Sequence, residues 1–153
     1  MKEINFYCVE EEPNLFIFSF IKNLFENKKK VIIYSDDKDK IEKLDNFLWV
    51  QKKTSFLPHL IQGENLDSIT PILISNIKEN KNNADFLLIS KFNNDEYFLS
   101  TFKKIFYMYC PINPTLNNIA RNDWNKYKEL GYNSKLLKKN SIGKWEEYTD
   151  FIN

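Results

Sequence analysis

Short, continuous runs of apolar residues recur along the chain and constrain its fold more than any other feature. Val31-Ile32-Ile33-Tyr34 and Phe86-Leu87-Leu88-Ile89 contain no polar alternation, as expected of strands that are buried on both faces. Similar apolar segments occupy residues 4–9, 71–75 and 105–110. The pattern predicts a mostly parallel central sheet, because only such a sheet is covered on both faces.

Amphipathic segments alternate with these strands. Helices are expected over residues 15–25, after the capping group Ser35-Asp36-Asp37, over about 95–103, and over about 115–130, where Gly131 follows as a stop signal. Residues 49–70 are expected to form an irregular connection. No linker or repeat divides the chain, so we expect a single Rossmann-like three-layer α/β domain over residues 1–153. Residues 132–153 are predicted to be an irregular or partly helical extension of it.

Scarce glycine argues against a nucleotide site in this Rossmann-like sheet. Phosphate binding there requires glycines after the first strand, so that backbone N–H groups approach the ligand. Only three glycines occur among the 153 residues, and the first strand is followed by Glu10-Glu11-Glu12-Pro13. Three carboxylates repel phosphate and Pro13 lacks an N–H donor. We therefore expect no nucleotide and no other cofactor.

The residues that carry chemistry do not form a catalytic or metal-binding pattern. Cys8 and Cys110 are far apart, and His59 is the single histidine, which excludes histidine-rich zinc sites. Asp36 and Asp37 are interpreted as helix-capping residues rather than a cation site, and His59 as a structural residue rather than a general base. With no long apolar run and no signal peptide, the sequence predicts a cytoplasmic, non-catalytic binding module that contacts no membrane.

The helix predicted over residues 115–130 carries the most informative surface. Leu116, Ile119, Ala120, Tyr127 and Leu130 form one stripe that is expected to face the sheet. Beside that stripe, Arg121, Trp124 and Lys128 are spaced by three and four residues, so they adjoin. An aromatic platform between two cations suits a partner that is acidic and apolar, although burial of Trp124 in the core is an equally open interpretation.

Charge is unevenly distributed around this helix. Residues 117–144 contain seven Lys or Arg against two Asp or Glu, a local charge of +5, whereas the remainder of the chain, with 15 against 19, carries −4. A second candidate contact surface comprises Trp49 and Phe56, for which core and contact interpretations both remain open.

Several ordered segments resemble one protein family. They are the pair Phe6-Tyr7, the strand residues 30–33, the piece from Leu44-Asp45 to Leu48-Trp49, Ser55-Phe56-Leu57-Pro58-His59, Gly63-Glu64, residues 88–90, and Ile119-Ala120-Arg121 followed by residues 127–132. These segments resemble the chi subunit of bacterial DNA polymerase III holoenzyme, with Leu-Asp-x-x-Leu-Trp and Ser-Phe-x-Pro-His as the most specific motifs.

The resemblance implies a non-catalytic adaptor that couples the clamp loader to single-stranded-DNA-binding protein. That protein's acidic C-terminal tail would bind at Cys110, Arg121, Trp124 and Lys128. The psi subunit, or a helicase-like or other clamp-loader protein, would bind at Trp49 and Phe56. DNA would be contacted only indirectly, at the replication fork in the bacterial cytosol. The residues beyond Trp145 extend past the usual family pattern. The alternative function is direct binding of single-stranded nucleic acid, with Trp124, Trp145 and Tyr148 stacking on bases.

Overall fold

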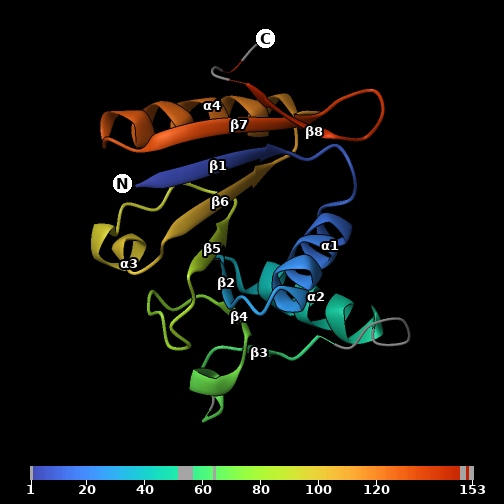
Figure 1. The fold of residues 1–153 in the computed structure, drawn as a ribbon, viewed down its shortest axis with the longest axis vertical. Helices are drawn as coiled ribbons and strands as arrows, with labels where there is room; N and C mark the ends of the chain where they lie inside the picture. Colours follow the sequence, from blue (N-terminus) through green and yellow to red (C-terminus); the bar gives the residue numbers. More distant parts are fainter. Residues whose placement is uncertain (1, 52–56, 64, 149–150, 152–153) are drawn as a thin grey trace.

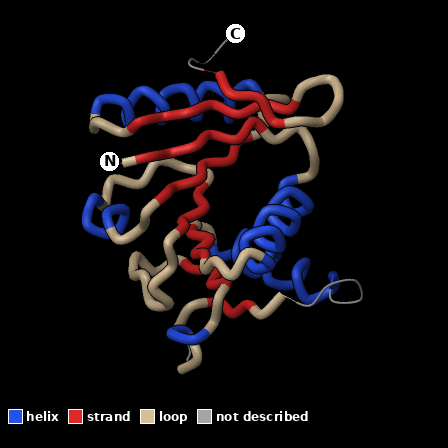
Figure 2. Tube along the Cα trace, viewed as in Figure 1, coloured by secondary structure: helices blue, strands red, loops and turns tan. Residues whose placement is uncertain are grey.

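One eight-stranded sheet organises the part of the chain that the computed structural model describes, residues 2–51, 57–63, 65–148 and 151 (Figures 1 and 2). The strands lie in the order β3-β4-β2-β5-β6-β1-β7-β8. Their bounds are β1 (Glu3–Cys8), β2 (Val31–Tyr34), β3 (His59–Ile61), β4 (Ile72–Ser75), β5 (Phe86–Ile89), β6 (Lys104–Tyr109), β7 (Asn133–Lys139) and β8 (Trp145–Tyr148). Every neighbouring pair is parallel except β7 and β8. The predicted α/β class with a mostly parallel sheet is confirmed.

Helices connect the strands. They are α1 (Pro13–Glu26), α2 (Lys38–Val50), α3 (Glu96–Ser100) and α4 (Pro114–Glu129), and Asp67–Ile69 forms a 3₁₀ turn. The acidic segments at the ends of β1 and β2 supply the helix caps. The Glu12 carboxylate accepts from Leu15 N at 3.0 Å, and the Asp37 carboxylate accepts from Asp39 N and Lys40 N at 3.0 and 3.3 Å. The interpretation of Asp37 as a capping residue is confirmed.

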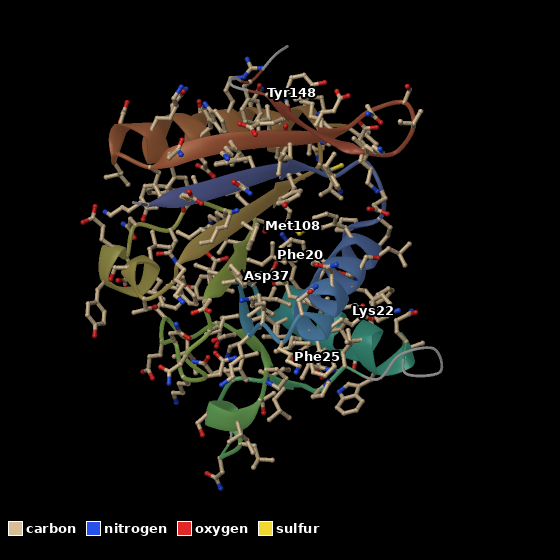
Figure 3. The ribbon with its side chains drawn as sticks, in the orientation of Figure 1. Phe20, Lys22, Phe25, Asp37, Met108 and Tyr148 are labelled. Atoms are coloured by element: carbon tan, nitrogen blue, oxygen red, sulfur yellow. The ribbon has the colours of Figure 1, made fainter. Side chains whose placement is uncertain are left out.

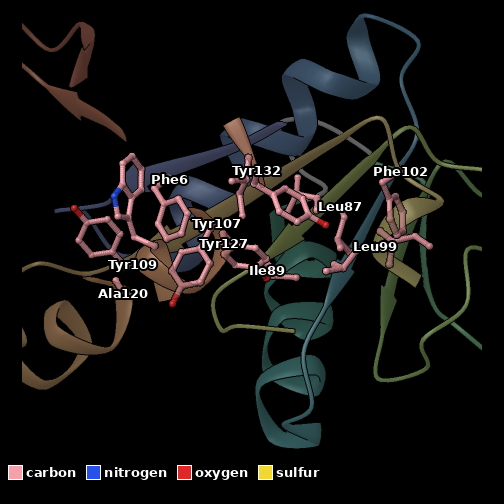
Figure 4. Close-up of a cluster of buried hydrophobic side chains, with 14 of the residues drawn as sticks. Phe6, Leu87, Ile89, Leu99, Phe102, Tyr107, Tyr109, Ala120, Tyr127 and Tyr132 are labelled. Atoms are coloured by element: carbon pink, nitrogen blue, oxygen red, sulfur yellow. The ribbon is translucent and has the colours of Figure 1, made fainter. Parts of the chain in front are cut away.

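Two hydrophobic clusters lie against the sheet, each built from alternate residues of the same strands. Ile32 and Leu73 belong to one cluster, whereas their neighbours Ile33 and Ile74 belong to the other, because successive strand side chains point to opposite faces. The first cluster includes α3 and α4, and Figure 4 shows it running from Tyr109 and Ala120 to Leu99 and Phe102. The second includes α1 and α2, and Figure 3 labels Phe20 and Met108 within it.

Residues 133–139 and 145–148 form strands, so the irregular or partly helical structure expected for residues 132–153 is wrong for these two stretches. β7 pairs with β1, where Phe6 lies opposite Leu136, and β8 folds back antiparallel to β7. Gly131 ends α4 with a φ of +86°, and Gly143, with a φ of +84°, lies in the turn between the two strands. The sequence of β7 looks polar because β7 and β8 form one edge of the sheet, where only part of each strand faces a core.

The expectation of an irregular connection over residues 49–70 is also partly wrong, because β3 lies within it. β3 has three residues and pairs only with β4, opposite Ile72, Leu73 and Ile74. So short an edge strand leaves almost no periodic signal in the sequence.

Candidate protein-docking surface on helix α4

Helix α4 has well-defined ends. Pro114 occupies the first turn, and the Asn113 side chain accepts hydrogen bonds from Thr115 N at 3.0 Å and Leu116 N at 3.2 Å. Lys126 and Lys128 lie in the last turn, where cations complement the helix dipole. These features hold α4 at the length predicted from the sequence.

The face of α4 that packs on the sheet differs from the predicted stripe. Ala120 and Tyr127 are buried as expected. Leu116 and Ile119, however, are 44% and 41% exposed. Asp123 and Trp124 are buried in their place. The buried face is rotated toward Asp123 and Trp124 because both side chains have partners in the core.

Of the two interpretations left open for Trp124, the structure supports burial in the core rather than an exposed platform. The side chain is only 2% exposed, and its ring meets the Phe6 ring edge-on with centroids 5.1 Å apart. Lys128 Nζ lies 5.6 Å from the centre of the same indole ring. Trp124 therefore supports the cationic surface from below, rather than facing solvent between the two cations.

Arg121 lies between core and surface. Its guanidinium carbon is 5.9 Å from the centre of the Phe151 ring, and its buried Nε has no hydrogen-bond partner among the described residues. A buried guanidinium N–H without an acceptor is costly, so this donor favours a partner that supplies an oxygen. Lys128 follows Arg121 by two helical turns, so the two cations lie on one side of α4.

Cys110 directly follows β6 and is half-buried. It lines an apolar cavity of about 310 Å³ together with Leu116 and Ile119, the two exposed apolar side chains of α4. Of the four residues predicted to form one site, the structure thus places Arg121, Trp124 and Lys128 around one side of α4, and Cys110 in the cavity beside its first turns.

Asp123 is the functional group of α4 that the sequence analysis missed. Its carboxylate accepts from the Tyr107 hydroxyl at 2.6 Å and from Phe92 N at 3.0 Å, and Lys126 Nζ lies 3.8 Å away. Asn93 N donates to the Tyr127 hydroxyl at 3.2 Å. Together these bonds fasten the loop after β5 to α4. The sequence did contain a signal for the burial of Asp123. It lies three residues after Ala120 and four before Tyr127, and therefore on the helix face that these two residues bury.

This network changes the acidity of the buried tyrosines. Burial, reinforced by the hydrogen bond to Asp123 and by its charge, raises the pKa of Tyr107 well above its ordinary value. Burial likewise raises the pKa of Tyr109 and Tyr127. All three tyrosines therefore remain protonated donors in the folded protein at neutral pH.

Two lysines of β7 lie over aromatic rings. Lys138 Nζ lies 5.3 Å from the Tyr148 ring centre, and Lys139 Nζ lies 5.3 Å from the Trp145 ring centre and 3.5 Å from the Glu11 carboxylate. Tyr148 is labelled beside β8 in Figure 3. Much of the excess positive charge of residues 117–144 therefore lies on α4 and β7, whereas β8 carries the acids Glu146 and Glu147.

The second predicted surface is described only in part. Trp49 is 40% exposed at the end of α2, whereas Phe56 lies outside the described residues. The Trp49 and His59 ring centres are 4.6 Å apart. His59 Nδ1 donates to Leu57 O at 2.6 Å, and its Nε2 faces an Asp45 oxygen at 3.3 Å. These contacts agree with a structural role for His59.

Comparison with known proteins settles the family. The family model described as DNA polymerase III chi subunit, HolC, matches residues 1–135. The chain belongs to the DNA polymerase III chi subunit family. It is also similar to the DNA polymerase III subunit chi of Escherichia coli (strain K12), with 24% identity over 141 residues that cover 87% of this chain and 95% of that protein. Membership of the chi family supports a role in DNA replication and confirms the resemblance seen in the sequence.

The described part of this chi-family chain shows neither a membrane span nor a metal cluster. None of its helices combines the length and apolarity needed to cross a bilayer. None of its His, Cys, Asp or Glu side chains gather in groups of three or more that would hold a metal ion.

Proposed function

We propose that the chain is a non-catalytic replisome adaptor, a single Rossmann-like three-layer domain over residues 1–153. It links the DNA polymerase III clamp loader to single-stranded-DNA-binding protein by binding that protein's acidic C-terminal tail, in the bacterial cytosol at the replication fork. Family membership over residues 1–135 supports the replisome setting. The observation that carries the tail site is Arg121, whose buried Nε lacks an acceptor among the described residues.

The proposed site combines charge with an apolar receptor. Arg121 and Lys128 would pair with tail carboxylates, and a charge-assisted hydrogen bond of this kind is worth about 1.5–3 kcal/mol. The apolar cavity that Cys110 lines with Leu116 and Ile119 would accept apolar side chains of the tail. Trp124 would fix the position of Lys128 from beneath through the stacking distance of 5.6 Å.

We expect Arg121→Ala to weaken binding of a peptide with several acidic residues and a Pro-Phe end by at least tenfold, or about 1.4 kcal/mol. Calorimetry at low salt measures the change. Lys103→Ala removes the same charge before β6, at the end of the strand opposite Cys110, and Trp49→Ala alters the second surface. Both controls should bind the peptide as the unmodified protein does.

Two results would count against this site. Equal affinity of Arg121→Ala and the unmodified protein would remove Arg121 from it. Affinity that stays constant as salt rises would refute the electrostatic contribution, because partly exposed charge pairs are screened.

The second surface is proposed to hold the psi subunit, or a helicase-like or other clamp-loader protein, at Trp49 and Phe56. The exposed Val50 extends the apolar area of Trp49, with 72% of its surface accessible. Tail and clamp-loader partners would then bind at different helices, α4 and α2.

Direct binding of single-stranded nucleic acid is less well supported. Trp124 is buried, and Trp145 packs edge-on against Tyr7 and Phe16 with centroid distances of 5.0 and 5.8 Å. Rings held in this way offer little face for stacking on bases. Anisotropy with a bare oligonucleotide tests the alternative, and submicromolar binding without a partner protein would favour it.

A further inference from the structure

Phe151 packs onto the residues proposed to receive the partner's tail. Its ring centre lies 5.2 Å from that of Tyr109 and 5.6 Å from that of Trp124, and the Arg121 guanidinium lies 5.9 Å from the same ring. Phe151 also meets Phe6 edge-on at 6.3 Å. One aromatic side chain near the C-terminus thus covers both the core tryptophan of α4 and the cation beside it.

The composition around Phe151 matches that of the proposed ligand. Asp150 precedes Phe151 in the sequence, so the chain carries an acid followed by phenylalanine. An acid and an apolar aromatic group are the two features that the proposed site selects in a tail. The family match ends at residue 135, so Phe151 belongs to a segment outside the matched range.

We propose that the chain's own Phe151 side chain occupies part of the tail site, and that a partner's tail must displace it in order to bind. This inference rests on the proposed tail-binding function and adds regulation to it. With Phe151 in place, the Trp124 side chain is only 2% exposed. The Phe151 ring lies against both Trp124 and Arg121, so an aromatic ring of the partner's tail cannot occupy the same position.

Displacement of Phe151 is physically reasonable. Phe151 is half-buried and lies at the margin of the cluster under α4, whereas Phe6, Tyr107 and Tyr127 form its fully buried centre. The preceding strand β8 is a four-residue strand at the edge of the sheet (Figure 1). When a side chain of the same protein occupies the site, the apparent Kd of the partner equals the intrinsic Kd divided by the fraction of molecules in which the site is open.

The test compares tail-peptide binding to three proteins by calorimetry: the unmodified chain, Phe151→Ala and Tyr148→Ala. Tyr148 is the matched control, because it is another C-terminal aromatic that packs against the same cluster, and its cation contact is with Lys138 rather than Arg121. We expect Phe151→Ala to bind the acidic Pro-Phe peptide about three- to tenfold more tightly than the unmodified chain. Tyr148→Ala should bind as the unmodified chain does.

The possible results separate this inference from the function beneath it. Equal affinity of Phe151→Ala and the unmodified chain would refute self-occupancy while tail binding stood. Weaker binding by Phe151→Ala would also refute it, since Phe151 would then be part of the receptor. Absence of binding by all three proteins would overturn the proposed function, and the self-occupancy with it. If Phe151→Ala binds the peptide more tightly, and adding Arg121→Ala to that variant abolishes the gain, the result would support both tail binding and self-occupancy.

A second measurement needs no variant and so does not depend on how Phe151→Ala folds. In NMR spectra of the unmodified chain, ring protons of Phe151 and Trp124 should show a mutual nuclear Overhauser effect. Saturating tail peptide should abolish that effect. If it persists in the peptide-bound protein, the tail binds without displacing Phe151 and the proposal is wrong.

Discussion

The two sides of the sheet are built from different kinds of core. The buried hydrophobic side chains of the cluster beneath α1 and α2 are aliphatic residues, phenylalanine and methionine, and beside them the buried His59 faces Asp45 of α2. The cluster beneath α3 and α4 buries four tyrosines, Trp124 and, on α4, the Asp123 carboxylate. On the first side stability depends mainly on shape and apolar area. On the second it also depends on hydrogen bonds, so the groups that hold α4 in place are coupled to the surface where Arg121 and Lys128 lie.

A large loss of stability on the side of α4 should follow from the removal of Asp123, through hydrogen bonds rather than packing. Asp123→Ala leaves the Tyr107 hydroxyl and Phe92 N without their acceptor, and we expect it to lower the free energy of unfolding by about 2–5 kcal/mol. Asp123→Asn keeps the shape and one acceptor oxygen, so it should cost less. Urea denaturation measures both values.

Leu44→Ala provides the comparison on the opposite side. Leu44 is 4% exposed on α2, and its truncation should cost about 2–5 kcal/mol through loss of packing alone. If Asp123→Ala were as mild as a surface substitution, the distinction between an apolar core and a hydrogen-bonded core would fail.

Alkaline pH should act mainly on the side of α4. Burial raises the pKa of Tyr107, Tyr109 and Tyr127 in the folded protein, so these groups bind protons more tightly there than in the unfolded chain. Their contribution to stability is complete below the unfolded pKa of about 10 and is lost as pH rises above it. Above that pH, each tyrosine that ionises only on unfolding lowers the free energy of unfolding by about 1.4 kcal/mol per pH unit.

The unfolding midpoint in urea, followed between pH 8 and pH 11, measures this loss. Tyr107→Phe should be less stable at pH 8, because Asp123 loses a donor, and should decline less steeply above pH 10. Identical slopes for the two proteins would mean that Tyr107 does not contribute to the alkaline loss.

The helix caps should give the smallest effects and should not distinguish the two sides. Asn113 caps α4 and Asp37 caps α2, each by accepting from two backbone N–H groups. Replacing either residue by alanine should cost about 1 kcal/mol in thermal or urea unfolding. If the two substitutions lowered the free energy of unfolding by clearly different amounts, part of the difference between the two sides would come from the helix caps rather than from the cores.

Sequence reasoning succeeded where local pattern and burial agree. The strand at Val31–Tyr34 and the helix that follows Asp37 are both as predicted, because a run buried on both faces and a capping residue are local signals. β3, β7 and β8 were missed because they lie at or next to the two edges of the sheet, where strands can be short and need not be apolar.

The candidate site was predicted in composition but not in geometry. Helical spacing brought Arg121, Trp124 and Lys128 to one part of α4, but it did not identify Asp123 as a buried residue. Only the Tyr107 hydroxyl, 16 residues earlier in the chain, explains why Asp123 faces inward and turns Trp124 into the core. A contact of that kind has no signature in helical periodicity.

The position of β1 has a consequence for synthesis of the chain. β1 is made before both of its neighbours in the sheet, β6 and β7, which begin at Lys104 and Asn133. While β2, β4 and β5 can pair with one another on a growing chain, Ile4 and Phe6 must wait about 100 residues for a partner. A nascent chain therefore carries an unpaired apolar strand until β6 has been made, and exposed strand edges favour aggregation during that period.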